Sequence, residues 1–166
     1  MKRWIIVGWL LTVGVALAGI AGKERLLARG DVVYLRLAPV DPRSLMQGDY
    51  MALNFSIANA VRVAHGTTPT RLAREEVIVI RRDARNEGHF VRLHKGEPLA
   101  ADERLLRVQN VPARWGGTGV QVSTDAWFFQ EGQAERYGQA KFGEFRVDAD
   151  GQALLVGMRD EALRGM

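Results

Sequence analysis

Charged and hydroxyl side chains gather in one short segment of the chain, PVDPRSLMQGDYMALNF, residues 39–55. The side chains in it that could do chemistry are those of Asp41, Arg43, Ser44, Asp49 and Tyr50. Neighbouring carboxylates can share acid–base work or bind a hard cation, and a serine beside a base can act as a nucleophile. The segment is therefore the first place to look for an active site or a binding site.

Local structure accounts for most of the same residues. Asp41 precedes Pro42, which suits a first helical position, so the Asp41 carboxylate can cap a helical turn over residues 43–47. Gly48 follows where a left-handed residue ends a helix, and Arg43 can pair with either neighbouring acid. The sequence thus predicts a capped helical turn that leads into the next strand.

A complete catalytic or metal-binding set is not evident in the sequence. Ser44 has no lysine in a supporting motif, and two acids are too few for a convincing calcium site. His89 and His94, five residues apart, point to opposite faces of one strand and cannot grip one metal ion. The WGGTG stretch lacks the lysine of a phosphate-binding loop but could present its tryptophan to a partner or to lipid. We predict no catalytic residue, no metal site and no cofactor; the candidate binding residues are Asp41, Arg43, Asp49, Tyr50 and Trp115.

The N-terminus indicates a membrane segment. Lys2 and Arg3 precede 19 uncharged residues, WIIVGWLLTVGVALAGIAG, close to the roughly 20 that span a bilayer as a helix. A signal peptide cleaved after the ALA at 16–18 is one interpretation. We favour an uncleaved signal-anchor, because the apolar run continues past that point and KERLLAR would extend the helix. We expect an anchor at residues 1–25 and a domain at 26–166. Its location would be the inner or cytoplasmic membrane, single-pass, with the domain facing the periplasm or cell exterior.

Composition bounds the partners of this domain. The formal charge of +4 becomes 4 − 2 = +2 without Lys2 and Arg3. A mildly basic domain outside the cytoplasm favours lipid headgroups or an acidic protein surface over nucleic acid, although an ordinary mixed-charge surface explains the same balance. The chain has no cysteine, which excludes disulfides and thiolate chemistry.

Short alternating or β-branched segments predict a β-rich domain. Strands are expected at 31–40, 49–57, 76–80, 89–94 and 103–110, within 120–129, and as a hairpin at 144–159. A helical pattern at 132–143 is weakened by glycines, and one of the adjacent Phe128 and Phe129 should face outward. The expected fold class is mainly β (α+β), a compact, mostly antiparallel β domain with one or two short helices after a transmembrane helix.

The segment GDYMALNF resembles the motif that names the bacterial GDYXXLXY family. Gly48, Asp49, Tyr50 and Leu53 match it, while Phe55 stands where the family has tyrosine, which counts against a role for a hydroxyl group there. The lead-in PVDPRSLMQ and the C-terminal FFQEGQAERYGQAKFGEFRVDADGQALLVGMR also resemble the family. The resemblance implies a small membrane-anchored, extracytoplasmic protein whose relatives accompany multi-spanning membrane proteins. The residues expected to shape the motif are Pro42, Gly48, Leu53 and Phe55.

These features favour an accessory or binding module, without catalysis, that works with an integral membrane protein. One alternative is a membrane-tethered hydrolase with Ser44 or Asp49 at its site, which a lysine, histidine or second acid beside either residue would support. Another is a binder of an envelope ligand, which a deep pocket lined by arginines and aromatic residues would support. The sequence predicts no oligomeric state.

Overall fold

A computed structural model describes residues 2–38, 46–47, 50–66, 73–112 and 118–166 of the chain. The helices are α1 (Lys2–Arg29), α3 (Ser56–His65) and α4 (Ala134–Tyr137). The strands are β1 (Asp31–Arg36), β2 (Met46–Gln47), β3 (Tyr50–Ala52), β4 (Glu75–Arg82), β5 (Gly88–Leu93), β6 (Glu103–Pro112), β7 (Thr118–Gln121), β8 (Ala126–Phe128), β9 (Phe142–Val147) and β10 (Ala153–Arg159). The paired strands of each sheet are antiparallel, so the predicted mainly β fold with short helices and an N-terminal apolar helix is confirmed.

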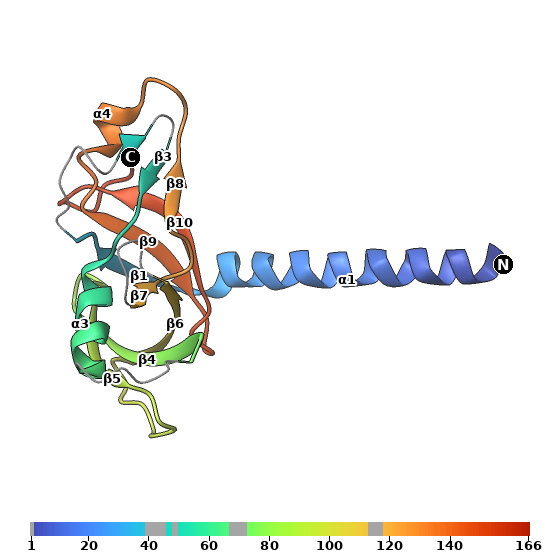
Figure 1. Cartoon of the computed structure of the whole chain (residues 1–166), viewed down its shortest axis with the longest axis horizontal. Helices are drawn as coiled ribbons and strands as arrows, with labels where there is room; N and C mark the ends of the chain where they lie inside the picture. The colour runs from blue at the N-terminus through green and yellow to red at the C-terminus, as the bar shows by residue number, and fades with distance from the viewer. Residues whose placement is uncertain (1, 39–45, 48–49, 67–72, 113–117) are drawn as a thin grey trace.

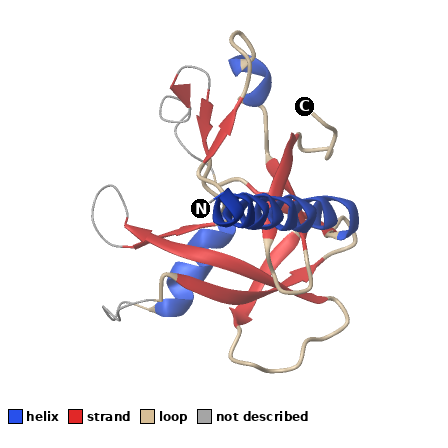
Figure 2. Ribbon diagram, turned by 90° about the vertical axis from the view of Figure 1, so that its right-hand side faces the viewer, coloured by secondary structure: helices blue, strands red, loops and turns tan. Residues whose placement is uncertain are grey.

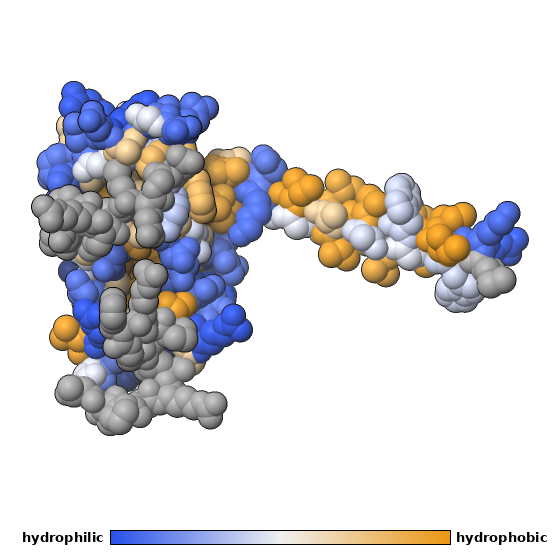
Figure 3. Space-filling model, turned by 45° about the horizontal axis from the view of Figure 1, so that its top comes forward, coloured by the Kyte–Doolittle hydropathy of each residue, from blue (hydrophilic) through white to orange (hydrophobic). Residues whose placement is uncertain are grey.

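The helix α1 projects from the β domain without interruption (Figure 1). Its last turns include the charged KERLLAR segment, as predicted, and the boundary expected after residue 25 lies inside it and stays a prediction. Apolar residues cover most of its length in Figure 3, and Trp4 is 80% exposed. Leu26 is the buried residue of α1. A Cβ added to Gly30 would lie 3.1 Å from the main-chain nitrogen of Val147, so the end of α1 packs directly on β9.

Two sheets form the body of the domain. β9 lies between β1 and β10 in one sheet, and the other sheet has the order β5-β4-β6-β7. A parallel bridge between Tyr34 and Glu87 joins the edges of the two sheets. The amide of Arg107 in β6 donates to the carbonyl of Gly151 in the β9–β10 turn at 2.8 Å. These two links hold the sheets around a common interior (Figure 1).

Apolar side chains from both sheets and from α3 fill this interior, which we call the main core. Its fully buried members include Val33, Leu35, Val61, Ile78, Ile80, Leu106, Val108 and Phe145. Ile78, Val79 and Ile80 are all 0% exposed, so the β-branched run is confirmed as a strand buried on both faces. Burying one such side chain contributes about 1.5–3 kcal/mol, so the main core dominates the stability of the fold.

A smaller sheet, β2-β3-β8, stands at one end of the body with α4 beside it (Figures 1 and 2). Its strands have 2, 3 and 3 residues, too few to be stable without packing. The packing comes from a second cluster, the minor core, whose buried residues are Met51, Tyr137, Ala140 and Met158. Leu37, Leu53 and Leu155 pack against both cores and connect them.

The alternating segment at 49–57 is a strand only at its start, contrary to the prediction. β3 ends at Ala52, and α3 begins at Ser56. The buried residues of α3 are Ile57, Ala58 and Val61. These positions recur at helical spacing, so a helix covers the main core with all three, whereas a strand would turn one outward. Gly66, with φ 70°, ends the helix.

The prediction of a helical turn is also wrong for its last two residues. Met46 and Gln47 form β2 and pair with Met51 and Tyr50 of β3, respectively. In this pairing their main-chain groups join a sheet, whereas an isolated helical turn fixes several dihedral angles for one hydrogen bond. Residues 41–45, which made up the rest of that turn, lie outside the described residues.

The remaining strand predictions are confirmed with shifted ends. The expected strands at 31–40, 89–94 and 103–110 correspond to β1, β5 and β6, and the hairpin at 144–159 corresponds to β9 and β10. The helical pattern at 132–143 forms only the single turn of α4. Phe128 is 73% exposed while Phe129 packs on the minor core, which confirms that one of the pair faces outward.

Candidate functional site

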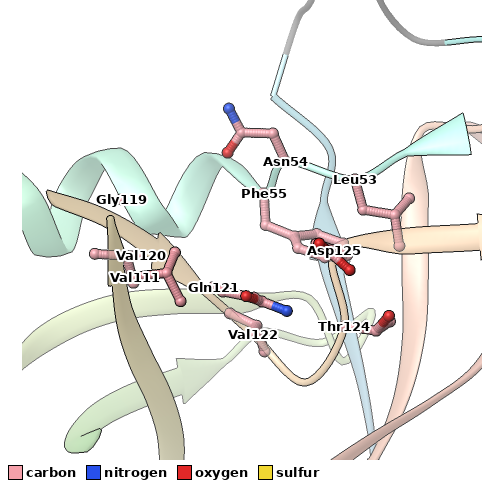
Figure 4. A pocket seen from close by; sticks show the side chains of 10 residues that line it. All are labelled: Leu53, Asn54, Phe55, Val111, Gly119, Val120, Gln121, Val122, Thr124 and Asp125. Carbon is pink, nitrogen blue, oxygen red and sulfur yellow. The ribbon is translucent and has the colours of Figure 1, made fainter. Parts of the chain in front are cut away.

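A cavity of about 380 Å³, which we call the motif cavity, lies beside the second half of the GDYMALNF segment. Leu53, Asn54 and Phe55 form one wall, and Figure 4 shows their side chains spreading in different directions from one short segment. The other walls come from the ends of β6 and β7 and from the connection to β8; their residues are Val111, Gly119, Val120, Gln121, Val122, Thr124 and Asp125. Segments distant in sequence therefore meet at this cavity.

Main-chain hydrogen bonds fix the wall formed by the motif. The amide of Leu53 donates to the carbonyl of Asp125 at 2.7 Å, which extends the pairing of β3 with β8 by one residue. The carbonyl of Asn54 accepts from the amide of Ala38 at 2.8 Å, and Phe55 forms an antiparallel bridge with Leu37. The wall is thus built like a sheet edge, so its side chains hold defined positions.

The motif cavity offers polar groups for binding. The hydroxyl of Thr124 donates to the carbonyl of Ala126 at 3.1 Å. The side chains of Asn54, Gln121 and Asp125 make no hydrogen bond or ion pair with the part of the chain that the structure describes. Two amides and a carboxylate can therefore donate to and accept from a ligand. Its described lining contains no histidine, lysine or arginine, and hence no pair of a nucleophile with a strong base.

Phe55 and Leu53 serve the structure of the site. Phe55 is 3% exposed, and its ring meets that of Phe145 edge to face with centroids 5.2 Å apart. A tyrosine hydroxyl in this apolar surrounding would need a hydrogen-bond partner, so phenylalanine suits the position. Leu53 packs against both cores. Their assignment as residues that shape the motif stays a prediction.

Tyr50 lies apart from the motif cavity, in the small sheet. It pairs with Phe128 across β3 and β8, and the two ring centroids are 5.7 Å apart. The next pair, Met51 and Trp127, packs on the minor core. Because successive residues of a strand face opposite ways, Tyr50 and Phe128 share the outer face of the small sheet. The motif thus contributes to two different surfaces.

Most of the predicted site residues lie outside the described residues: Asp41, Pro42, Arg43, Gly48, Asp49 and Trp115. Ser44, the candidate nucleophile, also lies outside them. Gln121, Thr124 and Asp125 were missed by the sequence reasoning. The signal that could have indicated them is the cluster Ser123-Thr124-Asp125 between two strands, because such residues make local turns that bring side chains to a sheet edge.

A second group of polar residues occupies the β4–β5 turn. The possible ligand atoms of Asp83, Glu87 and His89 lie within 4.8 Å of one another. Partial burial acts to raise the pKa of Asp83, but the amides of Glu87 and Arg85 together with His89 hold that pKa below its ordinary value. Glu87 also pairs with Arg36 at 3.2 Å. These contacts explain the group as a turn, and the absence of a metal site stays a prediction.

The described residues define a class of protein: an antiparallel β domain that carries one helix long and apolar enough, by length and composition, to cross a membrane. The chain belongs to the family described as GDYXXLXY protein, which matches it over residues 12–158. The resemblance noted in the motif is thereby confirmed, and the match begins inside α1. No curated protein and no solved structure matches the chain.

Proposed function

We propose that this protein is a membrane-anchored, extracytoplasmic accessory module that binds an integral membrane protein. The exposed surface of α1 is the observation that carries the proposal. The most apolar 18-residue stretch of this helix is not buried against the domain. An apolar surface of this extent is normally covered by lipid or by another protein. A signal sequence near the N-terminus can also be long and apolar enough to meet this description, so retention of α1 in the mature protein is part of the proposal.

Glycines in α1 support contact with the helix of a partner. A Cβ on Gly8, Gly14, Gly19 or Gly22 would meet no atom within 4 Å, so the described chain gives no packing reason for them. Glycine costs a helix about 1 kcal/mol relative to alanine. Inside a membrane, small residues let two helices approach closely. Gly14, Ala18 and Gly22, spaced by four, line one face of α1 for such an approach.

The motif cavity supports a binding role for the domain. Its lining brings Asn54 of the family motif together with Gln121 and Asp125, and these three side chains have no partner among the described residues. The described lining also lacks a pair of a nucleophile with a base. An extended segment of a partner could use these amides and the carboxylate together with the apolar groups of Leu53 and Val120. The proposed location is the outer side of the inner or cytoplasmic membrane, and Lys2 and Arg3 at the short end of the helix support this orientation. Lys23, Arg25 and Arg29 oppose it, but charges ahead of a long translocated domain weigh less.

The test uses the full chain in its native membranes with a photocrosslinking amino acid at one position at a time. Placed at Gln121 it reports partners of the motif cavity, at Gly14 partners of α1, and at Ala84, exposed in the β4–β5 turn, it serves as control. We expect Gln121 and Gly14, but not Ala84, to capture the same multi-spanning protein.

The intact mass of the recovered chain tests the anchor independently. A chain found in the membrane fraction with α1 retained is expected. Recovery only as a soluble species that begins near residue 19 would overturn the anchor. Retained α1 without capture from either position would overturn the protein partner.

A further inference from the structure

The end of α1 and the β domain enclose a cleft of about 790 Å³, which we call the junction cleft. One wall is the face of α1 that carries Arg25, Leu26 and Arg29. The other walls are residues 99–101, in the β5–β6 connection, and residues 147–150, at the β9–β10 turn. Leu26 is 6% exposed, so the base of the cleft is apolar while its rim carries charge.

The length of α1 places this cleft at the height of lipid headgroups, if α1 spans the bilayer as the proposed function requires. Residues 4–22, at about 1.5 Å of rise each, cover close to the roughly 30 Å of a hydrocarbon core. Arg25 then stands about 4–5 Å beyond the core, and Arg29 about 10 Å beyond it. The headgroup region is about 5–8 Å thick on each side. Arg25 therefore lies within that region, and Arg29 lies just beyond it, within reach of its long side chain. The junction cleft opens at the outer edge of the headgroup region.

Two cations of the junction cleft are available to a ligand. Arg25 and Arg29 are four residues apart, which puts them on one face of α1, and both are exposed. Neither makes a hydrogen bond or an ion pair with another residue that the structure describes. Arg104, in contrast, forms an ion pair with Asp31, with Nε of Arg104 2.7 Å from Oδ2 of Asp31. The free positive charge of the cleft thus lies on the helix wall.

A free anion stands on the opposite wall. Oδ1 of Asp148 accepts the amides of Asp150 and Gln152 at 3.0 and 2.8 Å, and this fixes the β9–β10 turn. The carboxylate of Asp150 has no partner among the described residues and is exposed. Glu103, also in the lining, pairs with Arg92. The junction cleft accordingly presents guanidinium groups on one side and one carboxylate on the other.

We propose that the junction cleft binds the headgroup of an aminophospholipid, a phosphodiester that bears a primary ammonium group. Arg25 and Arg29 hold the phosphate, because guanidinium groups donate paired hydrogen bonds to phosphate oxygens. Asp150 holds the ammonium group. Leu26 and Leu99 add apolar surface to the cleft beside these charged groups. The inference rests on the proposed anchoring by α1, and it deepens that function by naming a lipid that orients the domain on the membrane.

Native mass spectrometry of the full chain, purified in detergent with equimolar phosphatidylethanolamine and phosphatidylglycerol, tests the proposal. The wild-type chain should retain the ethanolamine lipid in preference. Arg25→Gln with Arg29→Gln should lower retention of both lipids about tenfold or more, because charge-assisted hydrogen bonds are lost. Asp150→Asn should abolish the preference while retaining phosphatidylglycerol. Lys23→Gln, which removes a charge from α1 outside the cleft, and Glu131→Gln, which removes an exposed acid elsewhere, should change neither quantity.

Several outcomes would overturn the lipid site. These are equal retention of the two lipids by the wild-type chain, an undiminished preference in Asp150→Asn, or an effect of Lys23→Gln as large as that of the double variant. Unfolding curves of each variant, matched to wild type, guard against misfolding. A chain that keeps α1 in native membranes but fails these tests loses the junction-cleft proposal alone. A chain found without α1 loses the proposed function itself.

Discussion

The main core and the minor core differ in what holds them together. In the main core, side chains from two sheets and α3 are buried almost completely, and long strands carry them. The minor core depends on α4, on strands of 2 and 3 residues, and on contacts to Met166 at the chain end. Regions with few buried contacts open at lower free energy than the whole molecule. The small sheet should therefore open while the body stays folded.

The family motif extends across both regions. Phe55 belongs to the main core, whereas Tyr50 lies on the small sheet, and Leu53 packs on both. The motif cavity opens between these positions. The motif thus fixes one end of its segment in the stable region and leaves the other on the element that opens more readily. A partner bound at the motif cavity would stabilise the small sheet by mass action.

Replacing Phe55 by alanine should have the largest effect on stability. The ring is 3% exposed and packs on Phe145, so its loss should lower the free energy of unfolding by about 3–5 kcal/mol. The matched control is Phe128→Ala, because Phe128 is 73% exposed, and its cost should stay within about 0.5 kcal/mol. Denaturant unfolding of both full-length variants in one detergent measures the difference. Similar costs for the two would contradict the assignment of Phe55 to the main core.

Gly143→Ala should cost less than Phe55→Ala but still disturb the main core. An added Cβ would stand 2.9 Å from Cε1 of Phe55 and 3.0 Å from the side chains of Leu155 and Phe145. Overpacking of this kind costs about 1–3 kcal/mol. Gly157→Ala on the neighbouring strand is the control, since nothing lies within 4 Å of its added Cβ. Equal thermal midpoints for the two variants would contradict the close packing of the Phe55, Leu155 and Phe145 side chains around Gly143.

Tyr137→Ala should separate the two regions. The Tyr137 ring stacks on that of Phe129 at 5.0 Å, and its loss removes the centre of the minor core. We expect amide exchange in β3 and β8 to accelerate about tenfold or more, while β4 and β6 keep their rates because they belong to the main core. Hydrogen exchange with mass spectrometry resolves these segments. Uniform acceleration would show instead that the two regions unfold as one unit.

Much of the main core was predictable from the sequence, because its strands carry their signal in a few adjacent residues. The β-branched run at 76–80 and the DADG turn before β10 needed no distant information. The junction of β3 with α3 was not predictable in the same way. Met51, Leu53, Phe55 and Ile57 alternate like a strand, and only their contacts with Leu37 and the main core show that the chain changes to a helix within that pattern.

The candidate site was less predictable than the fold. Of the residues predicted for binding, Tyr50 is the one that the structure describes, and it lies in the small sheet rather than at the motif cavity. Asp125 reaches the motif through the hydrogen bond from Leu53 that continues the pairing of β3 with β8, which is a long-range contact. Gln121 ends β7, which pairs with β6, and it meets the motif only at the cavity that both line. Sequence periodicity reports which face a residue takes, but not which distant segment will meet it.

The buried carboxylate of Glu103 should make part of the stability of the main core depend on pH, and this is the smallest of these effects. Glu103 is 5% exposed and accepts from Arg92 at 2.6 Å. The hydrogen bond from Arg92 lowers the pKa of Glu103 below its ordinary value of 4.5, and the amide of Ala100 adds to this while partial burial opposes it. A lowered pKa means that the unfolded chain binds a proton before the folded one does. The stabilisation is therefore complete above pH 4.5 and is lost as the pH falls through the lower, folded value.

Glu103→Gln should accordingly be less stable than wild type at pH 7, and this gap should close as the pH falls below 4.5. Thermal midpoints of both full-length chains between pH 7 and pH 3 measure it. Glu131→Gln, at an exposed position between β8 and α4, should show no gap that depends on pH. A constant gap down to pH 3 would mean that Glu103 acts through packing rather than through its charge. Because Glu103 lies in β6, the pH-dependent part should appear in amide exchange of β4 and β6 and not in that of β3 and β8.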